Sequence, residues 1–155
     1  MSKEHTTDLK KFLKPFDNAV IDLVLWLRDF AWDLCQDANE LIYDNYNAVA
    51  LGWSHTDKVS HNICSIAVYR TNSNIHFGFY WGNELSDPEK ILLGKGKQYR
   101  YILVKDKETF PQAYIKKLVF EAYTNSLSKV KDQKQKISGQ TIVKSVSPNR
   151  RSSNK

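Results

Sequence analysis

Apolar residues recur every three or four positions in two parts of the chain, which is the spacing of an amphipathic helix. The two segments cover residues 18–35 and 112–130. Just after the first segment, Asp37 is followed three residues later by Glu40, a pattern that resembles the start of another helix. The sequence therefore predicts two long helices and a separate short helix over residues 38–45.

Between these helical segments, apolar and polar residues alternate in short runs, as they do in half-buried strands. The predicted strands cover residues 47–54, 63–70, 75–81 and 99–104. The segments that connect them are too short for parallel crossovers. The order of elements predicts an α+β fold, with an antiparallel sheet of about four to six strands packed against N-terminal helices and a C-terminal helix.

The length of 155 residues fits one domain. We place this domain at residues 18–130, after an N-terminal arm of residues 1–17. Residues 129–155 carry eight basic residues and one acidic residue, so this segment accounts for the whole positive net charge of +6. Polar composition predicts that the tail, residues 131–155, is disordered. Positive charge outside the folded part disfavours a nucleic-acid-binding domain and leaves only weak contact of the tail with nucleic acid or anionic lipid.

Features of membrane-bound and exported proteins are missing from the sequence. No apolar run reaches the roughly 18 residues of a membrane span, and the first 15 residues lack the apolar core of a secretory signal. Cys35 and Cys64 form no CxxC pair, so neither a disulfide framework nor a zinc site is indicated. These features predict a cytoplasmic protein.

The first candidate site is a row of carboxylates. Residues 16–44 contain seven acidic residues and one basic residue. On an unbroken helix, most of these acids would share one side, and such oxygen-rich surfaces accept hard divalent cations such as ferrous iron or magnesium. The candidate metal ligands are Asp29, Asp33, Asp37, Glu40 and Asp44. The alternative is a solvated helix face, and a break near residue 37 would divide the row.

The second candidate site is a sheet face. If the sheet leaves a concave face uncovered, aromatic and polar side chains would line a mostly apolar pocket for a small molecule or a protein partner. The candidate pocket residues are Trp53, Arg70, His76, Tyr80 and Arg100. The alternative is that the aromatic residues of this region form ordinary core.

Catalytic motifs do not appear in the sequence. The turn that begins at Gly94 lacks the spacing and the terminal Ser or Thr of a phosphate-binding loop. The histidines share no helical face that would hold a metal, and no nucleophile elbow is present, although a Cys–His dyad stays open. The sequence favours a protein that is not an enzyme: a metal-handling protein, a binding module, or an interaction domain without a ligand.

Residues 74–101 combine an aromatic strand, an Asp-Pro turn, a Gly-x-Gly-Lys turn and an Arg-containing strand. This segment resembles the signature of the YdhG-like family, a bacterial domain of unknown function, and the similarity extends over residues 18–126. The chain departs from the family at Cys35, where a proline often follows in other members. The resemblance implies a small bent antiparallel sheet. Because some members are described as frataxin-like iron chaperones, it also implies ferrous iron as cargo and iron–sulfur or haem assembly proteins as partners.

Overall fold

The computed structural model describes residues 6–153, which form three α-helices and one six-stranded sheet. The elements in chain order are α1 (Thr6–Leu13), α2 (Asn18–Leu34), β1 (Asn39–Asp44), β2 (Ala48–Ser54), β3 (Asn62–Tyr69), β4 (Ile75–Phe79), β5 (Arg100–Val104), α3 (Gln112–Leu127) and β6 (Thr141–Val146). The strand order is β5-β4-β3-β2-β1-β6. The predicted α+β fold is confirmed, and the sheet is open.

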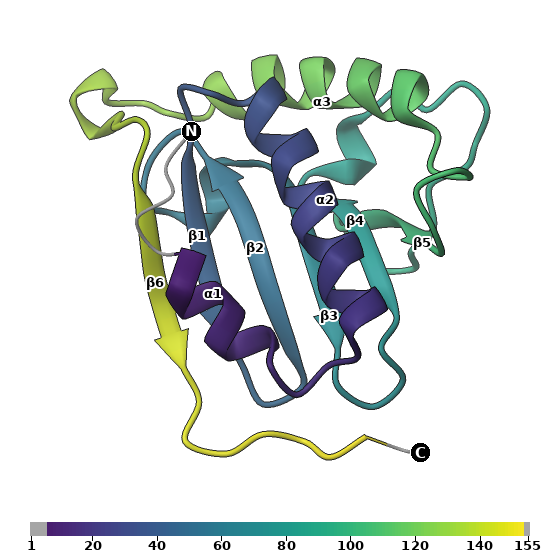
Figure 1. The fold of residues 1–155 in the computed structure, drawn as a ribbon. Coiled ribbons are helices and arrows are strands. Elements are labelled where there is room, and N and C mark those ends of the chain that lie inside the picture. The colour runs from purple at the N-terminus through teal and green to yellow at the C-terminus, as the bar shows by residue number, and fades with distance from the viewer. Residues whose placement is uncertain (1–5, 154–155) are drawn as a thin grey trace.

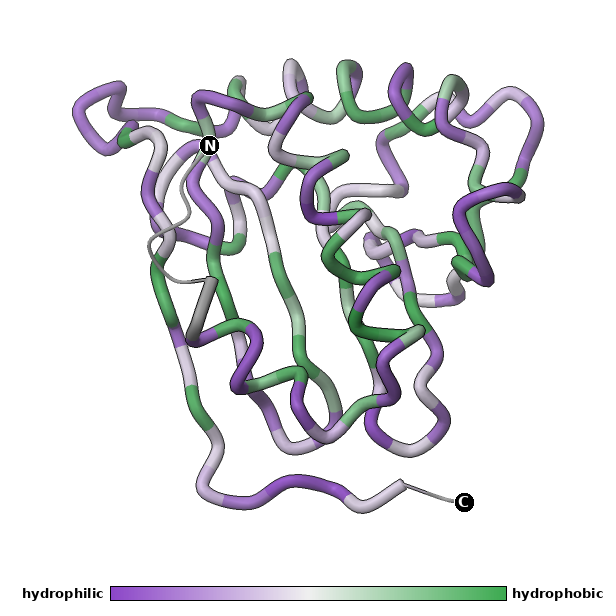
Figure 2. Tube along the Cα trace, in the orientation of Figure 1, coloured by the Kyte–Doolittle hydropathy of each residue, from purple (hydrophilic) through white to green (hydrophobic). Residues whose placement is uncertain are grey.

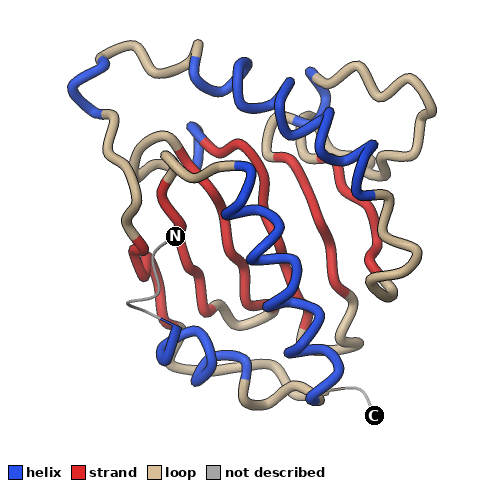
Figure 3. Tube along the Cα trace, turned by 45° about the horizontal axis from the view of Figure 1, so that its top comes forward, coloured by secondary structure: helices blue, strands red, loops and turns tan. Residues whose placement is uncertain are grey.

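The helices gather on one side of the sheet. Figures 1 and 3 show α2 crossing the strands, α1 beside it, and α3 running along one end of the sheet. We call the side under α1 and α2 the core face. It is formed by a cross-strand row of large apolar residues, each at most 7% exposed: Ile42, Leu51, Ile66, Phe77 and Ile102. None of the three described α-helices covers the opposite side, which we call the open face.

Aromatic contacts join the helices to the core face. Trp32 of α2 meets Trp53 of β2 edge to face, with ring centroids 6.1 Å apart, and Phe30 meets Phe77 of β4 at 5.9 Å. Fully burying side chains of this size contributes about 1.5–3 kcal/mol each to stability. Hydrophobic residues are concentrated in α2 and the central strands, whereas the connecting segments are mostly hydrophilic (Figure 2). The core therefore lies between the helices and one face of the sheet.

The long helices and four strands agree with the sequence prediction, but the short helix over residues 38–45 is wrong. This segment is strand β1, paired along its length with β2. Its alternation was hidden because two charged residues, Glu40 and Asp44, occupy core-face positions and are fully buried there. The apparent capping pattern at Asp37 belongs to the turn that ends α2.

The predicted arm and tail also differ from the structure. Helix α1 belongs to the core, because Leu9 and Leu13 are fully buried. The tail was predicted to be disordered, yet Thr141–Val146 forms β6, which pairs with β1 in parallel, so the sheet is mixed rather than antiparallel throughout. β6 was overlooked because its β-branched residues are embedded in a polar segment. Of the predicted arm and tail, residues 1–5 and 154–155 lie outside the described part of the chain.

Candidate functional site on the open face

The acidic residues of the first candidate site do not form a cluster. Glu40 receives two hydrogen bonds from the Arg28 guanidinium, at 2.7 and 2.8 Å, and a third from the Thr141 hydroxyl at 3.0 Å. Both partners of this ion pair are buried beneath α2. A buried charge requires a counter-charge and hydrogen bonds, and Glu40 has both. Its carboxylate is therefore part of the folded core.

The remaining carboxylates point in different directions. Asp44 is fully buried between the guanidinium groups of Arg70 and Arg150. Asp37 accepts a hydrogen bond from the Tyr123 hydroxyl on α3, and Asp29 and Asp33 are exposed on α2. Within residues 6–153, no group of three or more His, Cys, Asp or Glu side chains is placed to hold a metal ion.

The second candidate set is also divided by the sheet. Trp53 lies on the core face, and Arg70 is buried at the end of that face beside Asp44. The Arg100 guanidinium is used locally, because it donates to the carbonyl oxygens of residues 96 and 99 at 2.8 and 2.7 Å. Only His76 and Tyr80 lie on the open-face side, so the structure separates the three other residues from them.

A groove lies on the open face, with a volume of about 280 Å³. Four tyrosines form much of its lining, small residues form its floor, and two asparagines contribute polar groups. The lining residues are Tyr43, Asn45, Ala50, Leu51, Gly52, Val59, Asn62, Ser65, Ala67, Tyr69, Tyr80 and Tyr99. Among these described residues none is charged. We call this feature the tyrosine groove.

The groove exists because small residues alternate along the open face of the two central strands. Ala50 and Gly52 of β2 pair with Ala67 and Ser65 of β3. Because successive side chains of a strand point to opposite faces, these four residues lie together on one face and leave its centre low. The tyrosines of β1, β3 and the segments after β4 rise around that floor.

Two glycines allow side chains to lie flat against the sheet. A Cβ atom on Gly78 would overlap the ring of Tyr99, and one on Gly52 would overlap the carboxamide of Asn62. Glycine is therefore required at both positions for these side chains to keep their places. A glycine inside a strand often marks a close approach, and at Gly52 this close approach is to the Asn62 side chain.

A β-bulge brings Asn62 onto the open face. Trp53 pairs with Cys64, but the next residue of β2, Ser54, pairs with Asn62, so Ile63 is an extra residue in β3. The extra residue shifts the alternation, as bulges do, and re-aims the side chain that precedes it. Simple alternation through Cys64 would have placed Asn62 in the core.

Stacked rings stiffen the sheet beside the groove. The His76 and Tyr101 rings are parallel, with centroids 3.8 Å apart, and Tyr69 contacts His76 at 4.7 Å. Tyr99 stacks against Tyr101 at 5.6 Å. Tyr69 and Tyr99, which line the groove, are thus held by a continuous series of ring contacts, a preformed wall of the kind that aromatic ligands use.

Burial favours the neutral forms of several titratable groups on this face. Burial raises the pKa of Tyr99 well above its ordinary value, and burial also raises the pKa values of Tyr43 and Tyr69. Burial lowers the pKa of His76, which favours the neutral imidazole. At pH 7 the groove is therefore an uncharged aromatic surface with amide and hydroxyl groups.

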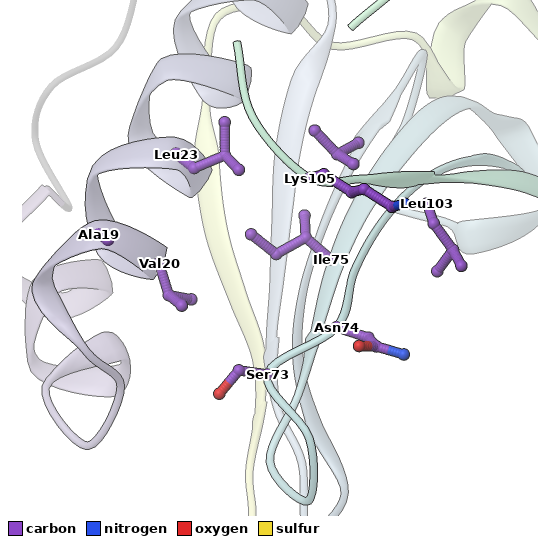
Figure 4. A pocket seen from close by; sticks show the side chains of 9 residues that line it. Ala19, Val20, Leu23, Ser73, Asn74, Ile75, Leu103 and Lys105 are labelled. Carbon is purple, nitrogen blue, oxygen red and sulfur yellow. The ribbon is translucent and has the colours of Figure 1, made fainter. Parts of the chain in front are cut away.

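A second groove, of about 350 Å³, lies between α2 and the β4–β5 edge of the sheet. Figure 4 shows Val20 and Leu23 facing Ile75 across it, with Leu103 and Lys105 on the other side. Several buried polar atoms have no hydrogen-bond partner among the described residues, but none of them belongs to a residue that lines this groove. It combines apolar contacts with the exposed polar side chains of Asn74 and Lys105.

Sequence reasoning identified the open face but selected only one residue that lines the groove, Tyr80. The missed signal was the alternation of small residues around Ala50 and Ala67, next to tyrosines at the same spacing. No family model, curated protein or solved structure matches this chain. No helix in residues 6–153 has the length and apolar character needed to cross a bilayer.

Proposed function

We propose that this protein is a binding module for neutral, planar aromatic small molecules, which occupy the tyrosine groove. The observation that carries the proposal is the combination of four tyrosines, a floor of small residues and an uncharged lining in one groove. Ligand pockets are typically concave, aromatic and mostly preformed, with a few polar groups that orient the ligand.

The chemistry of the lining defines the class of ligand. Rings such as those of Tyr43 and Tyr69 favour offset-stacked or edge-to-face contact with another aromatic ring. A charged ligand would lose its hydration in this groove without finding a counter-charge among the lining residues, which is costly. Neutral ligands are therefore preferred over charged ligands of the same shape.

Iron handling stays a prediction from the resemblance to the YdhG-like family. Of the five carboxylates proposed as ligands, Glu40 and Asp44 are buried in ion pairs with arginines, and Asp37 is engaged by Tyr123. No contact among the described residues favours iron as cargo. The tyrosine groove is the better supported site.

The test compares two ligands that share a ring system and differ in charge. The protein, with its tyrosine rings labelled with ¹³C, is titrated at pH 7 with 2-naphthol, which is neutral, and with 2-naphthoate, which is an anion. We expect 2-naphthol to shift the ring signals of Tyr43, Tyr69, Tyr80 and Tyr99. We expect 2-naphthoate to bind about tenfold more weakly, which corresponds to about 1.4 kcal/mol.

Two alanines of β2 supply a matched pair of variants. Ala50 lies in the floor of the groove, whereas Ala48 lies on the same face two residues away and is not part of the lining. Ala50→Leu should fill the groove and remove the binding of 2-naphthol, and Ala48→Leu should leave it unchanged. Equal binding by both variants, or an absence of tyrosine shifts in the unmodified protein, would overturn the proposal.

A further inference from the structure

We infer that the tyrosine groove selects heterocycles with a cis-amide edge, and that the Asn62 carboxamide forms hydrogen bonds with this edge. A cis-amide edge is an N–H donor beside a carbonyl acceptor. The inference rests on the proposed function and names the chemistry of its ligand. It is carried by a polar group of the groove that has no hydrogen-bond partner among residues 6–153.

Asn62 is only 5% exposed, and it lines the groove. Its Oδ1 atom is buried and has no hydrogen-bond partner among the described residues. Buried polar side-chain atoms in folded proteins are normally hydrogen-bonded, so an orphaned carboxamide oxygen indicates a missing partner. The bulge at Ile63 aims this side chain at the groove, and Gly52 provides the room for it.

A carboxamide presents one acceptor and one donor side by side. A planar ligand with a cis-amide edge presents the complementary pair, so both hydrogen bonds form at once in the plane of the ring. The same edge pairs with the Asn62 amide in either of its two orientations, because turning the ligand over exchanges its donor and its acceptor. This matters because the O and N atoms of an Asn side chain are exchanged by a half turn of the terminal torsion.

Other ligand classes fit this groove less well. The peptide group of a protein partner is trans, so its N–H and C=O point in opposite directions and cannot both reach one carboxamide. A purely apolar ring would stack on the tyrosines but would leave Asn62 Oδ1 without a partner. A charged heterocycle would meet no counter-charge among the residues that line the groove.

The experiment compares 2-quinolone with N-methyl-2-quinolone, which has the same fused rings and carbonyl group but no N–H donor. Binding is measured by isothermal titration calorimetry on the unmodified full chain, with 2-naphthol as the reference ligand. We expect 2-quinolone to bind about tenfold more tightly than its N-methyl derivative, a difference of about 1.4 kcal/mol. Equal affinities would overturn the inference.

A pair of asparagine variants locates the effect. In Asn62→Leu, the affinity for 2-quinolone should fall to that of the N-methyl compound. Asn45→Leu is the matched control, because Asn45 also lines the groove but its Oδ1 atom already accepts a hydrogen bond from Ser145 at 2.7 Å. The control should keep the preference of about tenfold. A preference that persists in Asn62→Leu would mean that the methyl group is excluded by shape, which would overturn the role of Asn62.

The outcomes separate this inference from the proposed function. If 2-naphthol binds and the two quinolones bind equally, the proposed function is supported. The inference that Asn62 recognises a cis-amide edge is then overturned. If none of the three ligands binds, both fail. Because the ligand pair is decisive in the unmodified protein, the test does not depend on the folding of Asn62→Leu.

Discussion

Two adjacent cross-strand rows of the sheet differ in the size of their side chains. The row on the core face, Ile42–Leu51–Ile66–Phe77–Ile102, is filled by large apolar side chains that pack against the helices. The next row, on the open face, is Tyr43–Ala50–Ala67–His76–Leu103. Its ends are large and its centre is small, so it leaves a groove where the first row leaves none.

The two faces also treat polar groups differently. The charged residues of the core-face side, Glu40 and Asp44, are buried and satisfied by arginines. The open face has no charge in its groove and has a carboxamide oxygen, that of Asn62, without a partner among the described residues. A face whose acidic groups are paired and whose apolar side chains are packed stabilises the fold, whereas a face with a groove and an unpartnered carboxamide oxygen in its lining is suited to bind.

The largest effect is expected from breaking a charge pair beneath the helices. Glu40→Ala removes a buried carboxylate that accepts hydrogen bonds from the Arg28 guanidinium and from the Thr141 hydroxyl, so we expect the free energy of unfolding to fall by about 3–5 kcal/mol. Urea denaturation of the variant and the parent measures this difference. A loss below about 1 kcal/mol, typical of an exposed ion pair, would show that the pair is solvated.

Neighbouring residues of β2 test the comparison of the two faces directly. Leu51→Ala creates a cavity on the core face and should cost about 2–5 kcal/mol. Ala50→Leu adds a larger side chain on the open face, where there is space, and should change the free energy of unfolding by less than about 1 kcal/mol. Denaturation of both variants under one set of conditions gives the two losses of unfolding free energy for comparison. Similar losses at the two positions would mean that both faces are packed.

Alkaline pH should weaken the open face. Burial raises the pKa of Tyr99 in the folded state, so its contribution to stability is fully present below the ordinary tyrosine value near 10.0 and is lost as pH rises beyond it. We expect the free energy of unfolding to fall between about pH 9 and pH 11, a range that brackets the ordinary tyrosine pKa of about 10. The fall should be smaller in Tyr99→Phe. The control is Tyr46→Phe at an exposed tyrosine, which should retain the full pH dependence. An identical pH dependence in Tyr99→Phe and the parent would contradict the burial of this ring.

The smallest effect is expected on the outer surface of α2. Asp29 is exposed and belongs to neither face of the sheet. Asp29→Asn should change the free energy of unfolding by no more than about 0.5 kcal/mol, measured beside Glu40→Ala. A loss as large as that of Glu40→Ala would show that the row of acids acts as one unit after all.

Much of the fold was predictable because local periodicity determines it. The long helices of residues 18–35 and 112–130 and the central strands followed from apolar spacing alone. β1 was missed because its buried acids are satisfied by Arg28 and by Arg70, partners that only the tertiary structure brings near. The parallel pairing of β6 is likewise a long-range contact that no local pattern contains.

The candidate site was less predictable than the fold. Alternation placed His76 and Tyr80 correctly, but the floor of the groove consists of residues such as Ala50, which carry no chemical signal of their own. Asn62 reaches the open face only because Ile63 is bulged, and one inserted residue reverses every prediction that is based on alternation.

The most direct test of the account is to locate a bound aromatic ligand by intermolecular nuclear Overhauser effects. With 2-naphthol bound, we expect contacts from its ring protons to the methyl groups of Ala50 and Ala67 and to the ring protons of Tyr43. Contacts to Val20 and Leu23 instead would place the ligand in the groove between α2 and β5, and would contradict the claim that the open face is the binding face.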